Sequence, residues 1–280
     1  MNTSLYISSG ALQAYQQKID TTSNNVANVN TTGYKRRDHT FSEILASQIN
    51  NQGRGNEGAG RLTPEGLRVG YGTRTGLTQL NMAQGSATET GKPFDMMISG
   101  NGFFQLGNGT TDEVSYTRDG NFHLSPNPDN EGSYHLVHAN GGLLLDQNGT
   151  PIELDGEYEV KIENNGQLQL KAKDGQGEAF LSDQRVGIVD IQNPSMLRNI
   201  GDNQFVIDPD TLPAGTNPAD YVRMMQAGEA ELSSGFLEGS NVDLMKEMTE
   251  LMTSQRSYQL NARAISYADQ MVGIANNILK

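Results

Sequence analysis

The chain contains no cysteine and no tryptophan, and only 6% of its residues are aromatic. Without cysteine it has neither disulfides nor thiolate metal ligands, which excludes folds that depend on either. No apolar run approaches the roughly 18 residues that a membrane-spanning helix needs. The N-terminus also lacks a basic region followed by an apolar core, so we expect no cleaved signal peptide and, if the protein leaves the cytoplasm, another export route.

Basic residues are scarce, since 20 Lys and Arg face 33 Asp and Glu and the net charge is −13. Binding of DNA or RNA requires clustered Lys and Arg against the phosphates, so we expect no nucleic-acid partner. The acidic excess lies in the middle of the chain, because residues 1–40 and 240–280 are close to neutral. An acidic middle favours solubility and repels chance partners.

Sequence patterns of catalysis and metal binding are weak. The segment GRGNEG at 53–58 fits G-x-G-x-x-G but follows a helical stretch, where a dinucleotide site requires a strand. The segment from Asn127 resembles the start of a calcium loop, yet position twelve is His138 where the loop requires Glu. His135 and His138 would lie on opposite faces of a strand. We expect no catalytic residue, no metal and no other cofactor, although counting carboxylates does not exclude a glycosidase pair.

Large apolar residues recur every seven positions at both ends of the chain, which is typical of a helical stripe that packs along a partner helix. The N-terminal series is Leu5, Leu12, Ile19 and Val26, and the C-terminal series is Leu244, Leu251, Tyr258, Ile265, Val272 and Leu279. Ser240, followed three residues later by Asp243, predicts the start of the second helix. One interpretation is that both helices pack on a central domain.

A second interpretation is that the helices pack among copies of this chain. At about 1.5 Å per residue, the C-terminal helix would be longer than a single domain is wide. A stripe buried against one partner also leaves the faces with Met245, Met252 and Tyr267 without neighbours. This pattern favours assembly through the two series of apolar residues.

The segment NNVANVNTTGYKRR, at 24–37, predicts the end of the first helix. Asparagine is a poor helix former that tolerates left-handed backbone, and Gly33 can take up a turn conformation. We define the helix-exit motif by six residues: Asn25, Asn28, Thr32, Gly33, Tyr34 and Lys35. Because residue 33 precedes the predicted β domain, a change at Gly33 is expected to leave that domain untouched.

These end segments resemble those of bacterial flagellar rod and hook proteins. SNNVANVNTTGYKR is similar to the N-terminal signature of that family, and GFLEGSNVDLMKEMTELMTSQRSY to its C-terminal signature. MISGNGFFQL, YTRDGNFHL and VDIQNPSMLRNIGDNQFV resemble its central landmarks in the expected order. The resemblance implies a basal-body rod subunit of the distal or second proximal type, whose partners are copies of itself, other rod and hook proteins and the flagellar type III export apparatus.

Between the ends, about ten short alternating runs are separated by Asn-Gly and Asp-Gly pairs, which predicts antiparallel hairpins in a barrel or sandwich. The expected fold is therefore α+β, with paired terminal helices forming a coiled-coil-like frame around an inserted β domain. The predicted boundaries are a helical assembly core at 1–32 and 240–280, extended connectors at 33–76 and 224–239, and a β domain at 77–223.

Two functions follow from these observations. The first is a structural subunit of the flagellar rod, which polymerises through its terminal helices into a tube that transmits motor torque to the hook. The second is a secreted cell-wall-associated enzyme or sugar-binding β module that is anchored by its helices. Rods in electron micrographs of the concentrated protein distinguish the first function from the second.

Overall fold

The computed structural model describes residues 2–43, 46–49, 67–70, 72–107, 114–128, 130, 132–172, 179–208, 221–226 and 228–278. The chain divides into two compact units. The helical unit consists of Met1–Ala27, Arg37–Gln79 and Asp243–Lys280, and the β unit of Asn28–Arg36 and Leu80–Val242.

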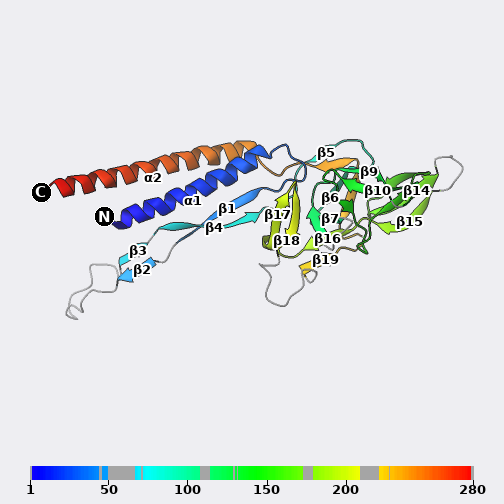
Figure 1. Ribbon diagram of the computed structural model, residues 1–280, viewed down its shortest axis with the longest axis horizontal. Helices are drawn as coiled ribbons and strands as arrows, with labels where there is room; N and C mark the ends of the chain where they lie inside the picture. The colour runs from blue at the N-terminus through cyan, green and yellow to red at the C-terminus, as the bar shows by residue number, and fades with distance from the viewer. Residues whose placement is uncertain are drawn as a thin grey trace, which may run out of the picture. The chain divides into compact units, whose positions relative to one another are not determined.

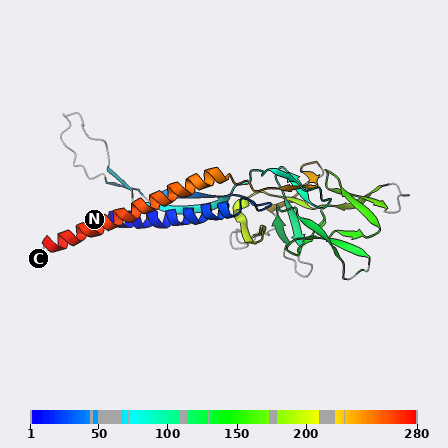
Figure 2. The same ribbon diagram turned by 90° about the horizontal axis from the view of Figure 1, so that it is seen from above.

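The helical unit is built on α1 (Asn2–Ala27) and α2 (Leu244–Ile278), which lie side by side in both views (Figures 1 and 2). The predicted start of the second helix is one turn too early at Ser240. The Asp243 carboxylate caps the helix instead, because its Oδ1 accepts hydrogen bonds from the backbone N–H groups of Met245 and Lys246 at 3.0 and 3.2 Å.

Four strands of the helical unit fall in the segment 33–76 that was predicted as an extended connector, or just beyond it. β1 (Arg37–Glu43) pairs with β4 (Thr73–Leu80), and β2 (Ala46–Ile49) pairs antiparallel with β3 (Leu67–Gly70). Phe41 of β1 places its ring centroid 5.6 Å from that of Tyr15 and 5.8 Å from Lys18 Nζ. Ring and cation contacts therefore hold β1 against α1.

In its described residues, the β unit contains seventeen strands and one short 3-10 helix. The strands are β5 (Ala87–Glu89), β6 (Met96–Ser99), β7 (Phe103–Gly107), β8 (Val114–Thr117), β9 (Phe122–Pro126), β10 (Ser133–His138), β11 (Leu143–Leu144), β12 (Glu153–Asp155), β13 (Tyr158–Ile162), β14 (Gln167–Ala172), β15 (Phe180–Arg185), β16 (Ile188–Ile191), β17 (Leu197–Gly201), β18 (Gln204–Ile207), β19 (Val222–Met224), β20 (Glu231–Ser234) and β21 (Phe236–Glu238). The 3-10 helix η1 (Pro194–Met196) is capped by the Asn193 side chain.

Ten of these strands form one sheet, whose central order is β12-β10-β11-β7-β8-β18-β17, with β9, β16 and β19 attached to it. β13, β14 and β15 make a separate three-stranded sheet, while β20 pairs with β6 and β21 with β5. All these described pairings are antiparallel. The predicted α+β class, with two terminal helices and a mainly antiparallel β domain, is confirmed.

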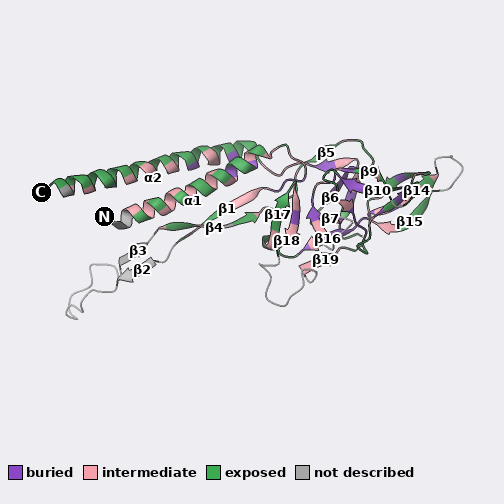
Figure 3. Cartoon of the chain, viewed as in Figure 1, coloured by how far each residue is buried: buried purple, intermediate pink, exposed green. Residues whose placement is uncertain are grey.

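Two hydrophobic clusters form the core of the β unit, where the buried residues gather in Figure 3. The larger cluster includes Phe104, Leu136 and Leu232, and the smaller includes Phe103 and Val189. Successive side chains of a strand point to opposite faces of its sheet, so the neighbours Phe103 and Phe104 of β7 enter different clusters and both faces of β7 are buried.

Only some of the predicted Asn-Gly and Asp-Gly turns close hairpins. Asn165–Gly166 joins β13 to β14, with Gly166 at φ 80° and its N–H bonded to Glu163 O. Asp119–Gly120 does not form a hairpin, because β8 and β9 pair with other strands. Gly120 is required there for a different reason, since a Cβ would lie 1.6 Å from Met96 O.

Candidate assembly site and helix-exit motif

The two helices run antiparallel, as two contacts between them show. Lys18 Nζ lies 3.7 Å from Glu250 Oε2, and the Asn25 side-chain amide donates to Glu247 Oε2 at 3.1 Å. Moving toward the C-terminus along α1 therefore corresponds to moving toward the N-terminus along α2. Asn25 and Glu247 are each only 1% exposed, so this hydrogen bond is shielded from water.

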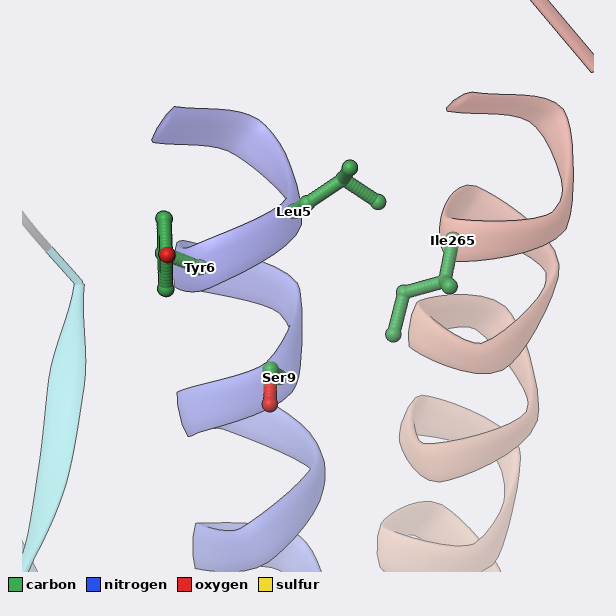
Figure 4. A pocket seen from close by; sticks show the side chains of 4 residues that line it. All are labelled: Leu5, Tyr6, Ser9 and Ile265. Atoms are coloured by element: carbon green, nitrogen blue, oxygen red, sulfur yellow. The ribbon is translucent and has the colours of Figure 1, made fainter. Parts of the chain in front are cut away.

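Near the free ends of the helices, Leu5 and Ile265 point toward each other across an open hollow of about 430 Å³ (Figure 4). Tyr6 and Ser9 also line this hollow. Leu5 and Ile265 belong to the two predicted seven-residue series. The antiparallel register that they define places Leu12, Ile19 and Val26 level with Tyr258, Leu251 and Leu244, because both series advance by seven.

Burial along these series is incomplete. Half-buried members are Leu5, Leu12, Ile19, Val26, Leu251, Tyr258, Ile265 and Val272, whereas Leu244 is exposed and Leu279 lies outside the described residues. The most deeply buried helix residues are small or polar: Ala14, Thr22 and Asn25 on α1, with Glu247, Ser254 and Ala268 on α2. Those on α2 lie three positions after Leu244, Leu251 and Ile265, which places them on the same face of the helix. This three-residue spacing is the sequence signal that could have identified them, but they are not large apolar residues.

A second apolar surface of α2 is exposed. We name as the outer stripe Leu260, Ala264, Tyr267, Met271 and Ile274, which recur at helical spacing and are all exposed. Leu260, Tyr267 and Ile274 each follow a residue of the seven-residue series by two positions, or about 200° around the helix. The outer stripe therefore faces away from the seam with α1, and Figure 3 shows α2 exposed along most of its length.

The helix-exit motif is divided between the two units. Asn25, in α1, binds the segment after the turn: its side chain accepts from Arg37 N–H and donates to Arg37 O, both at 3.0 Å. Asn28 receives a hydrogen bond from the Thr31 hydroxyl at 3.2 Å, and Thr32 O accepts from the Asn203 side chain at 2.7 Å. Residues 28–36 belong to the β unit.

Gly33 has a positive φ of 67° and its N–H donates to Glu238 O at 2.8 Å. A Cβ at this position would lie 2.5 Å from the backbone nitrogen of Asp119, so only glycine fits without moving the β unit. The expectation that residue 33 lies outside the β domain is therefore wrong. Tyr34 is also buried, at 5% exposure.

A buried ionic cluster lies directly after this turn. Lys35 Nζ is 2.7 Å from Glu238 Oε1, and Arg118 Nη1 is 3.1 Å from Glu238 Oε2, with all three side chains about 1% exposed. Burial lowers the pKa of Lys35 and of Arg118, while the hydrogen bonds and charge of Glu238 oppose that shift.

Backbone groups complete the cluster. Lys35 Nζ also donates to Ala83 O at 3.0 Å, the Gly85 N–H donates to Glu238 Oε1 at 2.8 Å, and Arg118 donates to Ile98 O and Gly100 O. Apart from Arg118 Nε, which has no hydrogen-bond partner among the described residues, the charged groups therefore have partners that replace the water they lose on burial.

Asn241 makes a second connection between the two chain ends. Its Oδ1 accepts from Arg36 N–H at 2.7 Å, and its Nδ2 donates to Asn81 O and Ala83 O at 2.8 Å. Glu238, Asn241 and Arg118 all fall within motifs noted in the sequence, but nothing in the sequence indicated that they meet Lys35 and Arg36. They are the functional candidates that sequence reasoning missed.

The described residues contain no group of three or more His, Asp or Glu side chains that could hold a metal ion. His135 and His138 have separate surroundings, since His135 lies 4.0 Å from Glu153 and buried His138 lies 3.5 Å from Asp119. In the described part of the chain, no helix is long and apolar enough to cross a membrane.

The geometry is that of a structural α+β protein, in which segments from both chain ends are bound to each other. Comparison with known proteins agrees with this class. Residues 5–35 match the family described as flagella basal body rod protein, residues 97–170 the flagellar hook protein FlgE/F/G D1 domain, and residues 233–278 the flagellar basal body rod FlgEFG protein C-terminal region.

Individual relatives are similar over nearly their whole length. The flagellar hook-basal body complex protein FlhP of Bacillus subtilis (strain 168) is 36% identical, over 99% of this chain and 100% of that protein. The flagellar basal-body rod proteins FlgG of the same bacterium and of Agrobacterium fabrum are each 32% identical, over 97% and 99% of both chains respectively. This chain belongs to the flagellar basal-body rod protein family, whose members are structural axial proteins and not enzymes.

Proposed function

We propose that this protein polymerises through α1 and α2 into the helical tube of the flagellar rod and transmits motor torque to the hook. The outer stripe carries the proposal. Leu260, Tyr267, Met271 and Ile274 are 54% to 64% exposed, although residues of this kind favour burial. A helix that presents apolar residues both to its neighbour and to solvent has a second surface for packing among further copies.

The seven-residue series supports the same proposal from the other side of the helix. With α1 against one face and a neighbouring subunit against the other, the two helices would act as a coiled-coil-like frame. A tube held by interlocked helices resists twisting more than one held by surface loops. The family membership supports further partners among the rod and hook proteins, and export through the flagellar type III apparatus.

Cross-linking tests the outer stripe directly, because the chain has no cysteine of its own. Tyr267→Cys places a single thiol on the stripe, and Glu159→Cys places one on an exposed position of β13 as the matched control. In concentrated protein that forms rods, a bifunctional maleimide should join Tyr267→Cys subunits into ladders of dimers and longer species.

Electron microscopy of the same samples should show rods for both variants before cross-linking. Ladders no stronger for Tyr267→Cys than for Glu159→Cys would contradict packing through the outer stripe. Absence of rods at any concentration of the unmodified protein would contradict polymerisation of the protein alone.

A further inference from the structure

The hydrophobic core of the β unit is formed without the segments nearest the helices. All described members of the two clusters, and the partly buried residues that pack on them, lie between residues 80 and 232. Tyr34 and Leu237 are buried but belong to neither cluster. The forces that hold the segments on either side of this range are therefore of a different kind.

We name as the latch the N-terminal arm, residues 31–36, together with the C-terminal arm, residues 236–241. The arms are joined by a backbone hydrogen bond from Gly33 to Glu238 O, by the Lys35–Glu238 ion pair and by the hydrogen bond from Arg36 to Asn241. The C-terminal arm is attached to the domain through Arg118, Ala83 O and the pairing of β21 with β5, and the N-terminal arm through Ala83 O and the Asn203 side chain. Polar contacts, rather than a shared hydrophobic core, dominate this attachment.

Glu238 is central to the charge balance of the latch. The described ion pairs of Lys35 and Arg118 both end on its carboxylate, so two buried cations share one anion. Without that anion, both cations would be buried with only dipoles as partners, which is strongly unfavourable. Releasing the arms into water relieves this cost for Lys35 without exposing the core clusters.

We propose that the latch is a separate cooperative device: its two arms open and close together around Glu238, while the β core remains folded. The arms lie next to α1 and α2 in the chain, so closing the latch ties the two chain ends together. The closure depends on residues that lie 203 positions apart in the sequence. Before the C-terminal arm is in place, the N-terminal arm keeps its contacts with Ala83 and Asn203 but lacks the anion that pairs with Lys35.

Hydrogen exchange of the full-length protein, read by mass spectrometry, tests this proposal. Amides of Gly33, Arg36 and Gly239 report on the latch, because their N–H groups bond to Glu238 O, Asn241 Oδ1 and Ser86 O. Strands β7 and β10 report on the core. In Glu238→Gln we expect exchange in both arms to rise at least about tenfold, with no change in β7 and β10.

Lys35→Met removes the cation of the N-terminal arm. It should also increase hydrogen exchange in the C-terminal arm, residues 236–241, since coupling between the arms is reciprocal. The matched control is Glu231→Gln, which neutralises an exposed carboxylate on the neighbouring strand β20 and should exchange like the unmodified protein. Unchanged exchange in Glu238→Gln would overturn the proposal. Faster exchange in only one arm of either variant would also overturn it. Loss of protection in β7 and β10, which includes failure of a variant to fold, would do the same.

Discussion

Replacing Asn25 with aspartate tests how the helical unit is held together. The Asn25 amide donates to Glu247 Oε2 at 3.1 Å and to Arg37 O at 3.0 Å, and both Asn25 and Glu247 are buried. Asn25→Asp keeps the size of the side chain but removes these donors. It also places a second carboxylate beside Glu247, at the point where α1 and α2 meet.

The free energy of unfolding that Asn25→Asp loses is set by the less costly of two outcomes. Either both carboxylates stay charged and repel each other, or the introduced carboxyl group is protonated. Two unit charges 3.1 Å apart repel by about 5 kcal/mol at an effective dielectric constant of about 20. Protonating the introduced carboxyl group at pH 7, about three units above its ordinary pKa, costs about 4 kcal/mol. Protonation is the smaller cost, so Asn25→Asp should destabilise the helical unit by about 4 kcal/mol at pH 7.

The stability of Asn25→Asp should depend on pH, because the introduced carboxyl group titrates beside a second carboxylate. The like charge of Glu247 raises the pKa of the introduced group in the folded state above its unfolded value. Stability is then lost as the pH rises through the folded-state pKa and recovered as the pH falls. At pH 5 the loss should shrink to about 1.5 kcal/mol, because the pH is then only about one unit above the ordinary pKa and protonating the introduced carboxyl group costs that much less.

Urea unfolding followed by circular dichroism at 222 nm measures this effect, since α1 and α2 contribute nearly all the helix described in the chain. Gln13→Glu is the matched control, because it makes the same amide-to-acid change at an exposed position of α1. It should shift stability by no more than about 0.5 kcal/mol at either pH. A wild-type midpoint for Asn25→Asp at pH 7, or a loss that persists undiminished at pH 5, would refute the reasoning.

Three further predictions follow. Limited trypsin digestion of the free subunit should remove the helices, whose outer surfaces have no neighbouring subunit to cover them, and leave a β fragment that retains buried Lys35 of the helix-exit motif. Cleavage after Lys35 as fast as at exposed lysines would contradict this. Leu251→Asp places a charge in the helix seam at a cost of several kcal/mol, so cells should export the subunit yet build no hook. Cells with Gln255→Asp, the control at an exposed position, should swim. Normal swimming of both would exclude a buried seam. Gly33→Val adds left-handed strain of about 1–2 kcal/mol to a backbone clash, while Gly91→Val has nearly the same φ of 68° with nothing within 4 Å. Electron microscopy should therefore show short or missing rods for Gly33→Val only, and equal defects would mean that the clash has no role.

The strands that sequence reasoning predicted correctly are those with strong local signals. GFFQL became β7 and SYHLVH became β10, because a short apolar run bounded by turn pairs specifies a strand locally, and four of the five residues of β7 are buried. β20 and β21 were assigned to a connector, although Leu232 is fully buried. Their partners β6 and β5 lie more than 130 residues earlier in the chain, and short strands of that kind carry little local pattern.

The helix seam was predicted in its large residues and missed in its small ones. The spacing of Leu5, Leu12 and Ile19 is visible as a heptad in the sequence. Ser254 and Ala268, in contrast, are recognised as buried residues only from the folded structure. Small residues at a helix interface allow close approach, and composition alone does not distinguish them from exposed small residues.

By itself the sequence determined the two terminal helices, the antiparallel β region between them, the glycine requirement at position 33 and the family. Each of these depends on local periodicity, turn chemistry or motifs that a short window contains. The tertiary structure alone decided that Glu238 is the shared partner of Lys35 and Arg118, and that residues 28–36 belong to the β unit. The physical reason is that burial of a charge depends on which distant segments surround it, so the same Lys35 would be an ordinary exposed cation until the last strands of the β unit are in place.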